Sequence, residues 1–313
     1  MQTQSSTPKR FNSLSEAMRA AQLPAPSHPL ITIINGLDNH IQAIPPSHSQ
    51  MLNFYKISFR MDVGGKIPYG RTTFDFLEGG LFFAAPTQII GADIQDTTVP
   101  VAPVYFKGQL ILLLHPDFLA QYPLAKKIKQ YNFFSYTVNE ALLLSDKEKT
   151  LILNLFRQIE QELLHPIDAI SQDIIIAQLD LLLNYAQRFY IRQFNTRKSL
   201  NYTIIEKINT VLEGYFDQPN HVQQGPPSVQ YLAEHIHVSP GYLSDLLRIA
   251  SGLNARQHIQ EFLIAKAKEQ LLSTDHSVNE IAYQLGFEHP QSFNKLFKAK
   301  TNQSPLQFRN SFN

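Results

Sequence analysis

Apolar residues at helical spacing recur in the last part of the chain and outline the same two-helix pattern twice. In the first copy, Ser228 precedes residues at positions i, i+3, i+4 and i+7, which share one helical face. These residues are Val229, Leu232, Ala233 and Ile236. After a turn at His237-Val238, Ser239 and Pro240 are suited to begin a second helix. That helix repeats the apolar spacing and is followed by Gly252. The pattern predicts a helix-turn-helix unit.

The second copy begins at Ser277, which with Glu280 forms the S-x-x-E pattern of a capping box. Gly286-Phe287 supplies the turn, and Pro290 opens the next helix. Asn302 stands where the first copy has Gly252. Between the copies, residues 255–272 carry an apolar residue at every fourth position, which predicts one long helix that acts as a rigid spacer. These spacer residues are Ile259, Leu263, Ala267 and Leu271.

The second helix of each copy, which we call the reading helix, gives the pattern its chemistry. The second reading helix carries amide and ammonium groups away from its apolar face: Gln291, Asn294, Lys295 and Lys298, with Lys300 nearby. Such groups can reach base edges in a major groove, and lysines can neutralise phosphates. The first reading helix presents Ser244 and Arg248 around Asp245, whose carboxylate repels phosphate. We expect binding to double-stranded DNA, with the first unit contributing less affinity.

These residues closely resemble the C-terminal domain of AraC/XylS-type bacterial transcription regulators. The runs that carry the resemblance are Tyr242-Leu243-Ser244, Ser277-Val278, Glu280-Ile281-Ala282, Gly286-Phe287, Phe297-Lys298, Ser304-Pro305 and Phe308-Arg309. The resemblance implies two helix-turn-helix subdomains that insert into successive major grooves, and a regulator that contacts promoter DNA and RNA polymerase. The chain departs from the family pattern at Leu247, Leu263 and Asn302, and at Asp245, where the family often has a base-contacting basic or amide residue.

Residues 28–146 consist of short alternating or apolar runs broken by glycine and proline, which predict β-strands. The runs cover residues 30–34, 54–60, 71–77, 81–85, 104–106 and 110–114. Closely spaced strands with turns favour an antiparallel sandwich or barrel. The segment from Gly79 to Pro86 resembles the glycine-strand-proline segment of the cupin-type jelly rolls that precede the DNA-binding half in many family members. Residues 1–27 are predicted to be a tail with at most a short helix capped by Ser13.

Two long helical patterns occupy residues 147–199. The first, from Lys147 to Leu164, has apolar residues at four-residue intervals: Leu151, Leu155, Ile159 and Leu163. The second runs from Ile174 to Phe194 with a wide apolar stripe. Each helix either packs on the sheet or pairs with its copy in a second subunit, as in family members that dimerise after the jelly roll.

The predicted fold class is therefore α+β with several domains. A β-rich, cupin-like domain is followed by a helical dimerisation segment and by an all-α DNA-binding domain in residues 200–313. That last domain should open with a helix from Tyr202 to Phe216, and residues 217–227 are interpreted as a flexible surface insertion because they are rich in Gln, Pro, Asn and Gly.

Composition favours regulation over catalysis. The formal net charge of +1 is compatible with DNA binding, because local clustering governs phosphate contact. The absence of cysteine removes disulfides and thiolate metal sites. The histidines of the β-rich part are scattered, and His235 and His237 lie on a helix and in a turn, so that they cannot easily converge on a metal. We therefore expect no enzyme activity, metal or cofactor.

The sequence also bears on location. Residues 1–11 lack the apolar core of a secretory signal, and the longest apolar run, residues 110–114, is too short to span a bilayer. We expect a cytoplasmic protein with no membrane partner.

A small-molecule effector is a further partner that the sequence suggests. Lys56, Ser58 and Arg60 alternate with apolar residues on one strand, and Arg71 begins a similar one. If this charged face looks into a barrel, it would bind a polar or anionic effector; otherwise it is the solvated side of an antiparallel sheet. The alternative function is a small-molecule sensor that acts through protein contacts with weak or lost DNA binding, which Asp245 and the near-neutral charge would favour.

Overall fold

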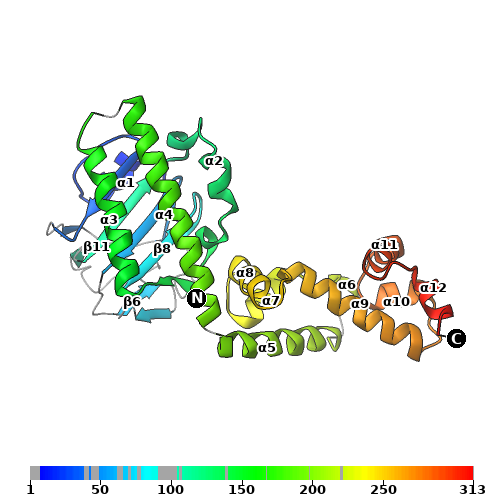
Figure 1. Ribbon diagram of the computed structural model, residues 1–313. Coiled ribbons are helices and arrows are strands. Elements are labelled where there is room, and N and C mark those ends of the chain that lie inside the picture. The colour runs from blue at the N-terminus through cyan, green and yellow to red at the C-terminus, as the bar shows by residue number, and fades with distance from the viewer. Residues whose placement is uncertain are drawn as a thin grey trace, which may run out of the picture. The chain divides into compact units, whose positions relative to one another are not determined.

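A computed structural model divides the chain into two compact units, residues 1–193 and 194–313. It describes residues 8–38, 42–43, 49–61, 66–69, 72–75, 79–90, 104–105, 108–137, 140–166, 168–196, 198–218 and 221–312. The first unit combines β-sheets with helices, and the second is helical (Figure 1). This arrangement confirms the predicted α+β class, whereas the cupin-like assignment stays a prediction.

A five-stranded antiparallel sheet, in the order β12-β8-β5-β11-β2, forms the centre of the first unit. Its strands are β2 (Ile31–Asn35), β5 (Tyr55–Arg60), β8 (Gly80–Ala84), β11 (Gln109–Leu114) and β12 (Leu142–Leu143). Because side chains alternate along a strand, Ile57 and Phe59 of β5 lie on one face of the sheet and Lys56 and Arg60 on the other. The predicted runs at 30–34, 54–60, 81–85 and 110–114 are confirmed as strands within a residue.

Shorter strands complete the β-structure that the described residues show. β4 (Gln50–Leu52) lies between β1 (Lys9–Phe11) and β9 (Ile89–Ile90), β3 (Gln42–Ala43) pairs with β10 (Val104–Tyr105), and β6 (Lys66–Tyr69) pairs with β7 (Thr72–Asp75). The runs predicted at 71–77 and 104–106 are strands where the structure describes them, and their remaining residues lie outside the described part.

Helices α3 (Asp146–Leu163) and α4 (Ala169–Thr196) lie across the sheet face that carries Ile57 and Phe59 (Figure 1). Phe156 of α3 stacks on Phe59 with ring centroids 5.9 Å apart. A capping box between Ser145 and Glu148 satisfies backbone N–H groups at the start of α3. Packing on the sheet, which was one of the two alternatives for these helices, is thus observed for both.

The residues that the sequence assigned to dimerisation are largely used inside the subunit. Leu155, Ile159 and Leu163 are buried in the first unit, and Leu151 is half-buried. An apolar helical face has the same sequence pattern whether it packs inside its own subunit or against a second copy. This face of α3 is therefore not available for pairing.

The segment from residue 9 to residue 20, predicted as part of a tail, belongs to the core. β1 pairs in parallel with β4, and α1 (Leu14–Ala20) follows it. Phe11, Leu14 and Met18 are buried in the cluster that also contains Ile111. The prediction was wrong because three apolar residues in a polar segment are too few to show a periodic pattern. Ser13 caps α1 as expected.

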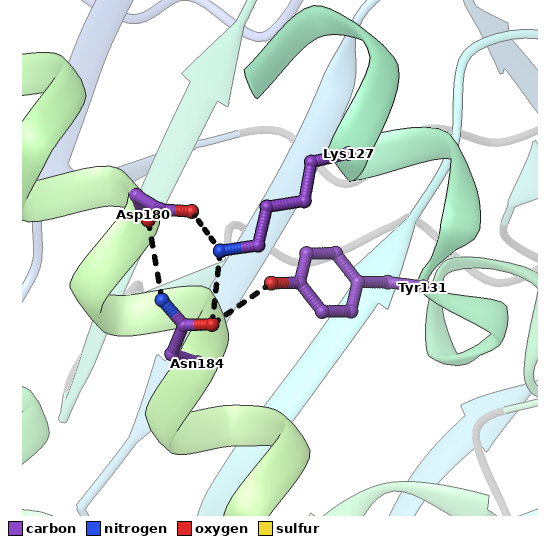
Figure 2. Close-up of polar contacts among 4 residues, drawn as sticks. All are labelled: Lys127, Tyr131, Asp180 and Asn184. Atoms are coloured by element: carbon purple, nitrogen blue, oxygen red, sulfur yellow. Dashed lines mark hydrogen bonds and ion pairs between the residues drawn. The ribbon is translucent and has the colours of Figure 1, made fainter. Parts of the chain in front are cut away.

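A polar cluster fixes the middle of α4 to the segment that precedes α3. That segment contains η1 (Pro116–Leu119), α2 (Leu124–Lys127), η2 (Ile128–Gln130) and η3 (Asn132–Ser135). The Lys127 ammonium lies 2.6 Å from an Asp180 carboxylate oxygen and 3.0 Å from Asn184 Oδ1, which also accepts from the Tyr131 hydroxyl at 3.2 Å (Figure 2). The hydrogen bond to Asp180 raises the pKa of Lys127 above its usual value. These contacts set the rotation of α4 about its axis.

The second unit arranges two helix-turn-helix pairs along α9 (Ala255–Ser273) (Figure 1). The first pair is α7 (Val229–Ile236) and α8 (Pro240–Ser251), and the second is α10 (Val278–Gln284) and α11 (Pro290–Thr301). The remaining helices of this unit are α5 (Lys198–Phe216), α6 (His221–Gln224) and α12 (Pro305–Asn310). The predicted caps are confirmed, because Ser228 and Ser239 accept backbone N–H groups and Ser277 forms a capping box with Glu280.

Gly252 and Asn302 end the two reading helices in the same way. Each adopts the left-handed conformation, with φ of 80° and 61°, which glycine and asparagine tolerate best. The departure from glycine at Asn302 therefore leaves the turn geometry intact.

Residues 217–227, predicted as a flexible surface insertion, lie largely at the surface where the structure describes them, but they are not without contacts. The described part of this segment contains α6 and lies against the turn that leads into α11, where Gly225 and Gly286 approach closely. Its composition concealed this contact because backbone groups make it.

Burial of α3 generates a stability prediction. Replacing Ile159 by Ala should lower the free energy of unfolding by about 2–5 kcal/mol, because it leaves a cavity under a fully buried helix face. The matched change Leu164→Ala, at a side chain that is 76% exposed, should cost about 0.5 kcal/mol or less. Urea denaturation measures both. An Ile159→Ala protein of unchanged stability but weakened self-association would show instead that this face pairs with a second copy.

Candidate nucleic-acid interface

Helix α11 buries one face and presents the other. Phe293 and Phe297 are fully buried, and burial of these rings holds the helix in one orientation. Gln291, Lys295 and Lys298 are then exposed on the opposite side. Pro290 at the first helical position and Asn302 at the end limit this surface to the length of one groove-sized helix.

Two of the predicted contact residues lie at the margin of that surface. Asn294 is half-buried, and its Oδ1 is buried without a hydrogen-bond partner. Lys300 is 23% exposed and forms an ion pair with Glu261 of α9, at 2.9 Å. The charge of Lys300 is therefore partly neutralised within the protein.

The first reading helix, α8, is less basic. Tyr242, Leu243, Leu246 and Leu247 are buried, and Ser244 is half-buried. The guanidinium of Arg248 is 55% exposed and donates to Asp245 at 3.0 Å. The acid that the sequence placed on this helix thus lies beside its cation.

The comparisons with known proteins agree with this geometry. A family model described as "Helix-turn-helix domain" matches residues 232–311. The uncharacterized HTH-type transcriptional regulator YfiF of Bacillus subtilis (strain 168) is 24% identical over 278 residues, which are 88% of this chain and 82% of that protein. An uncharacterized HTH-type transcriptional regulator of Pseudoalteromonas carrageenovora is 34% identical over 85 residues, 27% of this chain and 50% of that protein.

Among solved structures, the C-terminal domain of the two-component response regulator yesN of Fusobacterium nucleatum is 30% identical. That match covers 33% of this chain and 95% of that one, with a TM-score of 0.29.

This chain carries an AraC-type helix-turn-helix domain. It is a DNA-binding domain of transcription regulators, and the resemblance noted in the sequence is confirmed.

Residues that sequence reasoning missed adjoin the expected surface of the AraC-type domain. Ser292 and Ala299 are exposed on α11 beside the lysines. Ser292 follows Gln291 directly, so a closer account of the helical positions would have found it. Glu261 lies 39 residues before Lys300 in the sequence, and no local pattern indicates their ion pair.

The family's Ser-Pro-x-x-Phe-Arg run has a structural role in this domain. Ser304 caps α12, and Arg309 donates to the backbone carbonyls of Leu271 and His276 at 2.9 and 2.7 Å. These bonds fasten α12 to the end of α9 and to the linker that leads into α10.

The residues named as effector contacts lie in the first unit. Lys56 and Arg60 share the sheet face with Ala84, Leu113 and Ile111, which belong to the core cluster, and both charged side chains are half-buried. Burial and the nearby guanidinium of Arg60 lower the pKa of Lys56 to about 8, and burial lowers the pKa of Arg60 to about 10. Arg71 lies outside the described residues.

Among the described residues, no three His, Cys, Asp or Glu side chains are grouped as metal ligands would be. His235 faces the Tyr231 carbonyl, and His237 occupies the left-handed turn. Within the same residues, no helix combines the length and the apolar character that crossing a bilayer requires.

The environment of Lys56 generates a prediction about pH. Its folded-state pKa of about 8 lies below the ordinary lysine value of 10.5, so the unfolded chain binds more protons between these values and Lys56 makes stability rise with pH across that window. Lys56→Met should therefore stabilise the protein at pH 7, by on the order of 2 kcal/mol, with the gain shrinking toward pH 10.5. Urea denaturation at several pH values measures it, with exposed Lys129→Met as control. A gain in stability that is the same at every pH would contradict the lowered pKa of Lys56.

Proposed function

We propose that the chain is a sequence-specific transcription regulator whose second reading helix, α11, supplies most of the DNA contact. The observation that carries this proposal is the exposed row Gln291, Lys295 and Lys298 on a helix whose opposite face is buried. Lysine can donate to guanine O6 and N7, and glutamine can bond adenine in the major groove. Ser292 at the start of the helix and Lys298 farther along it are suited to phosphates.

The first reading helix, α8, contributes less affinity but is not inert. Its exposed cation, Arg248, is held by Asp245 at 3.0 Å, and part of its attraction for phosphate is offset by that carboxylate. An arginine in a fixed orientation remains able to contact a guanine edge. Helix α8 would therefore contribute more to sequence specificity than to the electrostatic attraction of DNA.

A homodimer would form through α4 and not through α3. Seven of the exposed residues of α4 fall at alternating steps of four and three: Ile170, Ile174, Ala177, Leu181, Asn184, Arg188 and Ile191. This is the heptad spacing at which two helices remain in contact along their length. Four of these side chains are large exposed hydrophobic groups, which a second copy of the same helix would cover.

The first unit would sense an anion. Lys56 and Arg60 lie on the sheet face that carries core residues, and burial lowers the pKa of both. A negatively charged effector would be attracted to these two cations. A regulator that reads promoter DNA acts in the cytoplasm, where such effectors and RNA polymerase are present.

The assignment of α11 predicts different effects for its two lysines. Lys295→Ala should cost about 1–3 kcal/mol on a selected binding site and relax specificity at one position, because it removes a base contact. Lys298→Ala should weaken binding to all sequences alike and reduce the salt slope by about 1, because it removes a phosphate contact. Gel shift at several salt concentrations, on a site selected from random DNA, measures both.

Lys300→Ala is the matched control, since Glu261 already pairs with that ammonium. Its salt slope should change less than that of Lys298→Ala. If Lys295→Ala bound the selected site with unchanged affinity and specificity, α11 would not be the main reading helix.

The proposed dimer is tested at the centre of the α4 stripe. Leu181→Asp should convert the protein to a monomer, because it places a charge where two copies would bury an apolar side chain. Leu164→Asp is the control, as Leu164 is an exposed leucine outside the stripe. Analytical ultracentrifugation gives the mass of each; a Leu181→Asp protein that remains dimeric would rule out pairing through this stripe.

A further inference from the structure

A segment outside both helix-turn-helix pairs connects them. Residues 217–227, which we call the bridge segment, leave α5 and enter α7, so they belong by sequence to the first pair. Gln218 donates to the Tyr231 hydroxyl of α7 at 2.8 Å, and the Tyr215 hydroxyl at the end of α5 donates to the Gly225 carbonyl. The bridge segment is therefore fastened to the first subdomain at both of its ends.

His221 carries the connection to the second subdomain. Its Nδ1 lies 2.7 Å from the Gln218 carbonyl oxygen, and its Nε2 lies 3.1 Å from the Gln284 carbonyl oxygen. Gln284 is the last residue of α10, where helical carbonyls lack partners inside the helix. The ring also lies edge-on to Phe216 at 5.5 Å. One imidazole thus spans from the bridge segment to the end of α10.

Backbone contact adds a second connection at the same place. Gly286, in the turn between α10 and α11, has φ of +84°, and a Cβ built on it would lie 2.6 Å from the Gly225 carbonyl carbon. Any other residue at position 286 would be strained by this positive φ, and its Cβ would push the bridge segment away. The turn that aims α11 is therefore packed directly on a segment anchored to the first subdomain.

We propose that His221 is a positioning residue that fixes the separation of the two reading helices, and so makes DNA binding selective for the spacing of half-sites. Helix α9 is the covalent connection between the subdomains, and a single helix can bend and rotate at its ends. The bridge segment supplies a second connection away from α9, and two connections restrict the relative motion that one permits.

The consequence for DNA follows from the geometry of the duplex, and this step rests on the proposed function. Two reading helices on one face of B-DNA need half-sites about one turn, or about 10 bp, apart. Changing that separation by one base pair moves a half-site by about 3.4 Å and rotates it by about 36°. A rigid pair cannot follow such a shift, whereas a loosely joined pair can.

The first experiment needs no DNA. The chain has no cysteine, so fluorophores can be attached to Ala250→Cys on α8 and Ala299→Cys on α11, both exposed positions. Single-molecule energy transfer should give a narrow distance distribution in this parent and a broader one after His221→Phe. His235→Phe is the matched control, because the hydrogen bond of the His235 ring, to the Tyr231 carbonyl, stays within its own helix. An equally narrow distribution in His221→Phe would overturn the proposal.

The second experiment measures affinity on selected sites whose half-sites are moved by one base pair in either direction. The unlabelled natural sequence should lose about tenfold or more, and His221→Phe about threefold or less. Identical spacing profiles for the two proteins would contradict the proposal even though both bind. Absence of any selective binding by the natural sequence would instead refute the proposed function, while the distance distributions would still decide on His221.

A variant that retains a hydrogen-bond donor covers the case in which His221→Phe does not fold. His221→Gln should fold and give a spacing profile between those of the natural sequence and of a loosened pair. A folded His221→Gln protein with the natural distance distribution and spacing profile would show that contact through two ring nitrogens is not needed, and would overturn the role assigned to His221.

Discussion

The apolar face of α9 is the surface on which both reading helices depend. Ile259, Leu263, Ala267 and Leu271 are buried along it, with α8 toward one end and α11 toward the other (Figure 1). Once the phenylalanines of α11 and the leucines of α8 are covered, the polar faces of these helices have only one direction left to point. The chemistry of DNA contact is therefore a consequence of core packing and not of an independently constructed site.

Charge within the second unit is distributed by local pairing. Asp245 holds Arg248, and Glu261 holds Lys300, at 3.0 and 2.9 Å. The cations that remain exposed on α11 are Lys295 and Lys298. A near-neutral chain can therefore present a small basic surface, because acids neutralise the neighbouring cations and leave the central ones uncompensated. Exposed ion pairs of this kind contribute little stability, so their main effect is to shape the potential that DNA meets.

The sequence alone predicted an element correctly where the interactions that form it join residues close together in the chain. Caps at Ser228, Ser239 and Ser277 and the periodic apolar faces are set by residues three or four apart, and the structure confirms those helices within a few residues. Contacts between distant segments could not be found in this way. The core role of Phe11, Leu14 and Met18 depends on a sheet that forms elsewhere. The pairing of Lys300 depends on α9, and the bridge segment is held by bonds between distant side chains and carbonyls, for which the sequence carries no local signal. The half-burial of Asn294 likewise follows from how α11 rotates against its neighbours.

The central claim is that two reading helices occupy successive major grooves on one face of DNA. Hydroxyl-radical footprinting of the full chain on a site selected from random sequence tests it most directly. The account predicts two protected patches about 10 bp apart on the same face of the duplex, with the stronger protection under α11. A single patch, or protection that is the same on every sequence, would contradict it.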